Sequence, residues 1–139
     1  MAGLPPLSEI LEEYRLVDAE DRYRLLIDLG GQLEPMPEAL KTDATKVRGC
    51  SASVWVYPTA REGRLHFLAD SNAAITKGIV ALVLSAVQDK PAAEIARMDV
   101  ADALAQFELS KHLSANRTQG VPNMIALVKQ TAERYANAA

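Results

Sequence analysis

The hydrophobic positions near the start of the chain recur at helical spacing. Leucine, isoleucine and tyrosine side chains follow one another three or four residues apart between positions 7 and 16, and glutamates and an arginine fill the positions between them. This pattern predicts an amphipathic helix. Asp18, a good N-cap residue, introduces a second apolar stripe that stops at Gly30 and Gly31. Two consecutive helices are therefore expected first.

The pattern then changes from helical spacing to the composition of strands. Residues 31–45 contain two prolines and little periodicity, which predicts a mostly irregular connection with one short turn at 38–41. β-branched and aromatic residues dominate 53–57, and a second such run covers 65–69. Since Pro58–Gly63 supplies turn residues between the two runs, they predict a β-hairpin.

The most apolar part of the chain follows the hairpin. Residues 72–88 are hydrophobic on nearly every side after Lys77, with Asp70 or Ser71 available as the N-cap. A helix that is apolar all round belongs in the interior of a fold. We therefore expect this helix to form the centre of the molecule.

Three shorter or amphipathic helices complete the pattern. Pro91 suits the first turn of a helix that ends at Met98, and Asp99 can cap another over 100–107. A final helix has Pro122 near its beginning, where the missing N–H costs little. Its apolar stripe comprises Met124, Ile125, Leu127, Val128 and Tyr135. Together the elements predict an α+β fold, with a small antiparallel β-sheet packed against helices in a single domain over 1–139.

Composition and charge exclude several classes of protein. The 139 residues are 49% hydrophobic and 24% charged, which is ordinary for a globular domain. The formal charge is −3 and no run of lysine or arginine occurs, so nucleic acid is not an expected partner. The longest apolar stretch, 78–87, is far shorter than the ~20 residues that span a bilayer, so no membrane is expected either. No secretory signal is visible at the start, and we expect a cytoplasmic protein.

Cys50 is the only cysteine. One cysteine cannot form an internal disulfide or a thiolate metal site, and in a reducing compartment it stays free. Gly49 permits a backbone conformation closed to other residues, and Arg48 with the local N–H groups could favour the thiolate. Ser51 and Ser53 could donate hydrogen bonds to the sulfur, although small polar residues also suit a turn. Composition alone favours a buried structural cysteine, because free cysteine is among the most buried residue types.

Three other residues invite a functional interpretation that the spacing does not support. His66 alternates within a predicted strand, and both it and His112 are expected to be structural or on the surface. One cysteine and two histidines without local ligand spacing do not predict a metal site. Trp55 alternates with valines and is expected to pack in the core or against the sheet.

Three blocks of the chain resemble the SufE-type sulfur acceptor proteins, the SufE/CsdE-like family. The first is the cysteine loop, residues 47–55, where the resemblance rests on Gly49, Cys50, Ser53, Val54 and Trp55. The second covers Asp70 to Gly78, and the third covers His112 to Gly120 followed by Met124. The blocks occur in the family's order and span nearly the whole chain.

The resemblance implies an α+β fold shared with IscU-type scaffolds and an accessory protein rather than an independent enzyme. Such a protein activates a cysteine desulfurase, takes sulfane sulfur on its cysteine as a persulfide, here Cys50, and passes the sulfur to an iron–sulfur scaffold complex. The pyridoxal phosphate cofactor belongs to the desulfurase, and this chain is expected to bind none. Relatives commonly have Asp-Ser-Asp where this chain ends in Asn72, so a charge-based role there is in doubt. Asn72 and Arg117 are the implied partner-binding positions, and Arg117 could instead steady the cysteine loop.

Other functions stay open at this point. The chain could be a helical interaction module with an incidental cysteine, a cysteine-dependent enzyme, or a sulfur carrier for another sulfur-trafficking pathway. The enzyme interpretation lacks a histidine paired with Cys50 by motif. Because a persulfide is easily reduced, we expect Cys50 to rest in an apolar pocket lined by the hairpin and by the helix around Ile75 and Ile79. Such a pocket would raise the pKa of the thiol.

Overall fold

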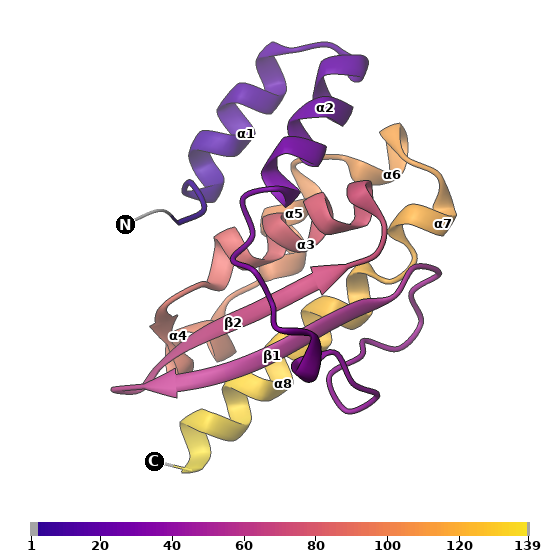
Figure 1. Ribbon diagram of the computed structural model, residues 1–139. Helices are drawn as coiled ribbons and strands as arrows, with labels where there is room; N and C mark the ends of the chain where they lie inside the picture. The colour runs from indigo at the N-terminus through magenta and orange to yellow at the C-terminus, as the bar shows by residue number, and fades with distance from the viewer. Residues whose placement is uncertain (1–2, 139) are drawn as a thin grey trace.

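A three-stranded antiparallel sheet with helices against one face forms the centre of the molecule (Figure 1). The computed structural model describes residues 3–138. The strands are β1 (Val54–Arg61), β2 (Arg64–Ser71) and β3 (Lys90–Pro91), in the order β1-β2-β3. The sequence therefore predicted the α+β class correctly, whereas the two-residue strand β3 was not predicted.

The hairpin is longer and tighter than the sequence indicated. Its register runs from Val54 opposite Ser71 to Arg61 opposite Arg64, so only two residues form the turn. These are Glu62 and Gly63, with φ of 54° and 78°, as a two-residue turn with both central φ values positive requires. Pro58 lies inside β1 instead of in the turn. This position tolerates proline because β1 is an edge strand.

One face of the hairpin and the helix α3 (Ala74–Val87) form the core. Alternate residues of each strand are buried on this face, and α3 is buried on nearly every side. Large side chains that are almost fully buried here include Val54, Leu65, Phe67, Ile79, Leu82 and Val83. The central position predicted for this helix is thus confirmed.

The predicted cap of α3 is wrong. The helix begins at Ala74 with Ala73 as N-cap and no side-chain hydrogen bond, so Asp70 and Ser71 remain in β2. Both side chains are used elsewhere. The Asp70 carboxylate forms an ion pair with Lys41 at 2.7 Å, and the Ser71 hydroxyl donates to the carbonyl oxygen of Ser53 at 2.7 Å.

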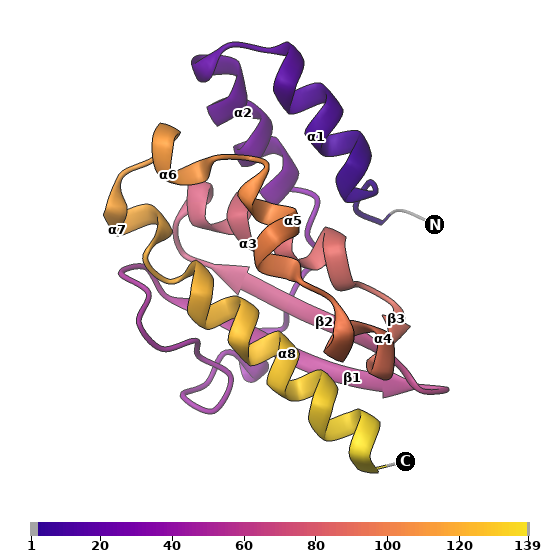
Figure 2. The same cartoon turned by 180° about the vertical axis from the view of Figure 1, so that it is seen from behind.

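The helices α1 (Leu7–Leu16) and α2 (Ala19–Gly30) lie beyond α3, as the view from behind also shows (Figure 2). As predicted, Asp18 caps α2, because its carboxylate accepts a hydrogen bond from the N–H of Asp21 at 3.0 Å. α2 packs backbone to backbone on α3, since a Cβ at Gly78 would clash with the carbonyl oxygen of Leu26. α1 is held mainly by two buried side chains, Ile10 and Tyr14.

The remaining helices surround α3 and the covered face of the sheet. The 3-10 helix η1 (Glu38–Leu40) is the short turn expected in the irregular connection, and α4 (Ala92–Arg97), α5 (Val100–Ala105) and α8 (Val121–Ala138) match predicted helices. The short helices α6 (Leu109–His112) and α7 (Ala115–Thr118) were not predicted. Among the described residues, no helix combines the length and apolarity needed to cross a membrane.

Residues 31–53 cross the outer face of the sheet and then run along the free edge of β1 (Figure 1). Hydrogen bonds join Val47 N to the Val54 oxygen at 2.8 Å and Val56 N to the Thr45 oxygen at 2.9 Å. Trp55 is only half-buried and lies on this outer face, with the Lys41 ammonium 5.5 Å from its ring centroid. It therefore packs on the sheet and not in the core. The segment delivers Cys50 to the end of the sheet where α3, α7 and α8 meet.

Candidate functional site

Cys50 occupies a small recess between the loop that carries it and three helices. The recess is lined by Ser51, Ala52, Thr76, Asn116, Arg117, Gly120 and Met124. Cys50 is half-buried, and its sulfur lies against Gly120, where a Cβ would clash with it. Gly120, just before α8, therefore provides the space that the thiol fills.

Hydrogen bonds between the loop and its surroundings hold the loop in place. The Asn123 amide donates to the carbonyl oxygen of Arg48 at 2.8 Å, before the cysteine. The Ser51 hydroxyl donates to the carbonyl oxygen of Asn116 at 2.6 Å, directly after it. Further along, the Asn72 side-chain oxygen accepts from the N–H of Ser53 at 3.1 Å. Because backbone hydrogen bonds of the sheet begin only at the end of the loop, these side chains fix its shape.

Two features of the structure require glycine at position 49. Its φ is +83°, in the left-handed region that favours glycine, as the sequence suggested. A Cβ at this position would also clash with the Asn123 amide. The turn immediately before Cys50 therefore depends on a residue without a side chain.

The electrostatic surroundings of the thiol differ from the sequence expectation. Burial raises the pKa of Cys50, and the Arg48 charge contributes nothing to the shift. The Arg48 side chain is exposed, and its residue contacts the rest of the site through the backbone. Ser51 donates to a carbonyl oxygen and Ser53 acts through its backbone, so neither supplies the expected hydrogen bond to the sulfur. In this arrangement the thiol is the favoured form.

An open groove of about 430 Å³ continues from the recess. The two share Ser51, Ala52, Thr76, Asn116 and Arg117, and the groove adds Tyr23 together with residues 73–75 at the start of α3. Arg117 donates to the Tyr23 hydroxyl at 3.1 Å, and Tyr23 is 39% exposed. The thiol therefore lies at the closed end of a groove that is open to a partner.

The expected lining of the cysteine pocket was partly wrong. Thr76, not Ile75 or Ile79, is the α3 residue beside the thiol, and the hairpin strands do not reach it. Ile75 lines the neighbouring groove, while Ile79 is fully buried in the core. The reason is the direction of α3, whose first turn reaches the cysteine loop while later turns cover the sheet.

Both histidines lie away from the thiol. The His112 ring contacts the Arg22 guanidinium at 3.0 Å, and His66 lies between the carboxylates of Glu34 and Asp89 at 2.9 and 2.7 Å. Neither lines the recess around Cys50, so no cysteine–histidine pair exists in the described structure. Within residues 3–138, no three His, Cys, Asp or Glu side chains come together as a candidate metal site.

Several residues of the site were not predicted as such, among them Gly120, Asn123 and Tyr23. Gly120 belongs to a block that resembles the family, but its contact with the sulfur joins positions far apart in sequence. Asn123 lies one residue after Pro122 in the first turn of α8, where a polar residue is unremarkable. Tyr23 looked like part of an apolar helix stripe. No local pattern shows that these three meet the cysteine loop.

Comparison with known proteins agrees with this geometry. Residues 8–132 match the SufE family, described as an Fe-S metabolism associated domain. An uncharacterized SufE-like protein of Rhizobium meliloti (strain 1021) is 39% identical over 132 residues, covering 91% of this chain and 94% of that protein. The solution structure of a hypothetical protein from Thermus thermophilus covers 97% of this chain and 99% of that one, with a TM-score of 0.77. At 14% identity that structure shows the fold alone. The chain belongs to the SufE family, and its role is sulfur trafficking in iron–sulfur metabolism.

Proposed function

We propose that this protein accepts sulfur from a pyridoxal-phosphate-dependent cysteine desulfurase as a persulfide on Cys50, stimulates that enzyme, and passes the sulfur to an iron–sulfur scaffold complex. The observation that carries the proposal is the position of the only thiol. It lies half-buried at the closed end of an open groove, against Gly120. A partner seated over the groove therefore lies next to the recess that holds the sulfur.

The transfer needs a single nucleophile. The Cys50 thiol loses its proton to solvent, and the thiolate attacks the outer sulfur of the persulfide on the desulfurase cysteine. The S–S bond of the donor breaks, and its electron pair leaves with the donor cysteine as a thiolate. Cys50 then carries the persulfide, with no net oxidation or reduction. The same displacement, with Cys50 as the leaving thiolate, moves the sulfur onward to a downstream acceptor.

Burial makes the Cys50 thiol less reactive in the resting protein than it would be in water. The raised pKa of Cys50 lowers the fraction of thiolate, which is the reactive form. Movement of the loop out of the recess would expose the sulfur to water and remove that effect. The loop can move locally because hydrogen bonds from a few side chains hold it, among them those of Asn123 and Ser51. We therefore infer that docking opens the loop and activates the thiol together.

The groove beside the thiol is the surface we assign to the desulfurase. Tyr23 and Arg117 are exposed there and linked to one another, so an aromatic ring and a guanidinium are available to a partner. Asn72 is exposed at the same end of the molecule, and its side-chain oxygen is bonded to Ser53 N. In this proposal Arg117 contacts the partner directly, and Asn72 acts on the partner through the shape of the cysteine loop.

The cofactor belongs to the partner in this scheme. Pyridoxal phosphate on the desulfurase releases sulfur from free cysteine, and the present chain contributes only the acceptor thiol and the docking groove. The protein is then an accessory to the desulfurase, without a substrate or cofactor of its own. Its expected location is the cytoplasm, where a lone thiol stays reduced.

Cysteine-dependent sulfide release by a desulfurase, with and without this protein, tests the proposal. Wild type should stimulate release, and Cys50→Ser should abolish the stimulation. A matched control moves the thiol by one position in the double variant Cys50→Ser/Ser51→Cys, which retains one cysteine and the same composition. It should also fail, because the side chain at position 51 is bonded to the Asn116 carbonyl oxygen, whereas the side chain at position 50 lies against Gly120.

Two outcomes would favour the alternatives. Full stimulation by Cys50→Ser would indicate an interaction module whose cysteine is incidental. Sulfur loaded on Cys50 but transferred to an acceptor outside cluster assembly would indicate a carrier for another sulfur pathway. The proposed scheme requires both the loss of stimulation in Cys50→Ser and delivery of sulfur to a scaffold complex.

A further inference from the structure

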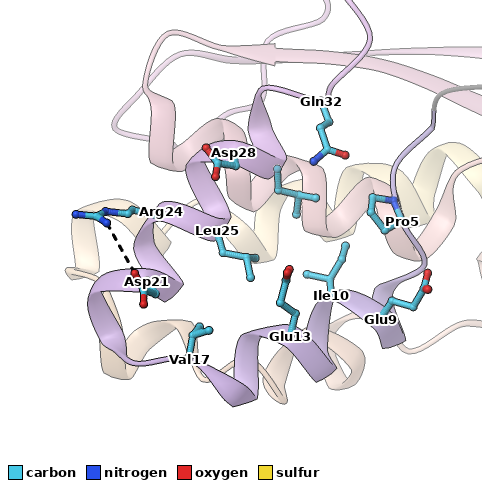
Figure 3. Close-up of a pocket in the computed structure, with 11 residues that line it drawn as sticks. Pro5, Glu9, Ile10, Glu13, Val17, Asp21, Arg24, Leu25, Asp28 and Gln32 are labelled. Atoms are coloured by element: carbon cyan, nitrogen blue, oxygen red, sulfur yellow. Dashed lines mark ion pairs between the residues drawn. The ribbon is translucent and has the colours of Figure 1, made fainter.

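A second groove lies on the far side of α2 from the thiol, between α1 and α2 (Figure 3). α2 follows α3 closely through the Gly30–Gly78 contact, whereas α1 buries only Ile10 and Tyr14 fully and makes no such close backbone contact. The two helices therefore diverge, and a cleft of about 660 Å³ opens between them. This volume is within the range of about 300–1,000 Å³ found for ligand sites.

Two helical stripes face each other across this cleft. α1 contributes positions 9, 10 and 13, with Val17 just after it, and α2 contributes positions 21, 24, 25, 28 and 29. Both sets follow the spacing of one helix face. Ile10 and Leu29 are each only 3% exposed and form the floor, and the half-buried Val17 and Leu25 add apolar surface beside them. The cleft is thus a groove along two helices whose lining is about equally apolar and polar.

The rim of the groove is acidic. Glu9 and Glu13 line it from α1, and Asp21 and Asp28 line it from α2, against one cation, Arg24, among the lining residues. Four carboxylates and one guanidinium give the rim a charge of −3. Arg24 is already engaged by Asp21 at 3.9 Å and by Glu20 at 3.1 Å. Among residues 3–138, no cation lies within ion-pair distance of Glu9, Glu13 or Asp28.

The end of α1 adds an exposed apolar side chain next to this rim. Leu16 is 82% exposed and shares a shallow hollow with Glu9, Glu12 and Glu13. A single exposed leucine needs no explanation by itself. Here it adds apolar surface beside Glu9 and Glu13, which also line the groove, so a partner lying along the groove can cover both.

We propose that the groove between α1 and α2 docks an amphipathic helix of a partner protein that carries lysine or arginine beside its apolar face. An elongated groove with an apolar floor accepts the apolar stripe of a helix. The acidic rim complements basic residues that flank such a stripe and repels an acidic helix of the same shape. The carboxylates of the rim offer only acceptors, which selects a donor-rich, cationic partner.

The proposal does not depend on the chemistry of Cys50. α2 presents Asp21, Leu25 and Asp28 to this groove, while Tyr23, on another face of the helix, lines the groove beside the thiol. A helix bound between α1 and α2 therefore leaves the thiol groove accessible. The protein can then hold one partner at each side of α2.

Fluorescence anisotropy with a synthetic helix tests the proposal on the full-length protein. The probe is a labelled amphipathic peptide of about 18 residues, five turns of helix, built from leucine and lysine. A leucine–glutamate peptide of the same pattern serves as its counterpart. We expect binding of the lysine peptide, weakened by salt, and no binding of the glutamate peptide.

Two triple variants separate the groove from the general acidity of the protein. Glu9→Gln/Glu13→Gln/Asp28→Asn neutralises the rim and should weaken binding roughly tenfold, since three partly screened contacts of about 0.5 kcal/mol each sum to one decade. The control set neutralises Glu94, Asp102 and Glu133, which are exposed on α4, α5 and α8. It removes the same charge and should change binding less than twofold. Cys50→Ser should bind the peptide like wild type.

Four results would overturn the proposal. Equal weakening by both triple variants would show that only net charge attracts the peptide. Equal binding of the glutamate peptide would show that the acidic rim does not select the partner. Amide chemical-shift changes that map away from α1 and α2 when the lysine peptide binds would show that the peptide binds elsewhere. A dimer in sedimentation that is lost in the rim variant would assign the groove to a second copy of the chain. Unchanged stimulation of a desulfurase by the rim variant keeps this test separate from the function of Cys50.

Discussion

The core around α3 and the loop around Cys50 are held by different kinds of contact. The core joins Val54, Phe67, Ile79 and many other apolar side chains that are almost fully buried. The loop adds Val47 and the half-buried Cys50 to this packing, but a few hydrogen bonds and one glycine contact determine where Cys50 lies. Many apolar contacts therefore stabilise the fold, whereas only a few contacts position the reactive thiol.

This contrast separates stability from reactivity. Loss of a buried aromatic side chain costs several kcal/mol, whereas loss of one hydrogen bond near the surface costs about 1 kcal/mol. A substitution in the core should lower the free energy of unfolding without changing the reactivity of the folded thiol. A substitution at the loop should change the reactivity of the thiol and have a smaller effect on the free energy of unfolding. The following predictions examine that division.

The largest effect on stability is expected from Phe67→Ala. Phe67 is 1% exposed in the middle of β2, so its truncation should lower the free energy of unfolding by about 3–5 kcal/mol. Urea unfolding measures the loss. Under conditions where the variant is folded, alkylation of Cys50 by iodoacetamide should proceed at the wild-type rate. A faster rate would show that core packing also controls the loop.

Gly120→Ala should affect both properties. The new methyl group would occupy the position of the Cys50 sulfur, so the thiol must leave its recess. We expect destabilisation of about 1–3 kcal/mol from overpacking and an alkylation rate several times that of wild type. Gly3→Ala is the matched control, because nothing lies within 4 Å of a Cβ there. Wild-type alkylation of Gly120→Ala would contradict the proposed recess.

Asn123→Ala isolates the hydrogen bond that holds the start of the loop. It removes the donor to the Arg48 carbonyl oxygen and should cost about 1 kcal/mol or less of stability. Because the loop then opens more often, alkylation of Cys50 should become faster, though less so than in Gly120→Ala. Asn137→Ala, at an exposed position near the end of the same helix, should leave the rate unchanged. Similar alkylation rates in Asn123→Ala and Asn137→Ala would show that the Asn123 hydrogen bond does not hold the loop closed.

The smallest predicted effect is a pH dependence of the free energy of unfolding that comes from His66, on the outer face of the sheet. Burial lowers its pKa, but hydrogen bonds to Asp89 and Glu34 outweigh burial, so the folded pKa lies above the usual value. A raised folded pKa stabilises the fold below the unfolded value of ~6.5, and the stabilisation disappears as pH rises through the folded pKa.

The unfolding free energy of wild type relative to His66→Asn should therefore decrease as pH rises from below the unfolded pKa of ~6.5 through the raised folded pKa of His66. The measurement is urea unfolding of both proteins across this range. The alkylation ratio of the two proteins should stay constant with pH, because His66 does not line the thiol recess. A difference that grows with rising pH would contradict the assigned hydrogen bonds.

The same contrast explains what the sequence could predict. Helical and strand periodicity identified α1, α2, the hairpin and α3, because local pattern and core packing agree in these elements. α6 and α7 are each four residues long and have too few apolar positions to show a period. The two-residue β3 depends on pairing with Arg64 and Leu65, which lie more than twenty positions away in sequence.

The site divides in the same way. The Gly49–Cys50 pair is visible in the sequence, and the positive φ of Gly49 follows from local geometry. The roles of Gly120 and Asn123 follow only from the approach of α8 to the loop. The expected influence of Arg48 on the thiol failed because a neighbour in sequence can point away in space. Local sequence identifies the nucleophile, and tertiary contacts decide its state.

The central claim is that Cys50 carries sulfur, and intact-protein mass spectrometry tests it most directly. The protein is incubated with a cysteine desulfurase and free cysteine, and its mass is then measured before and after reduction with dithiothreitol. Wild type should gain the mass of one sulfur atom, lose it on reduction, and differ in this from Cys50→Ser, which should gain none. An unmodified wild-type protein beside a desulfurase that itself carries a persulfide would contradict the account.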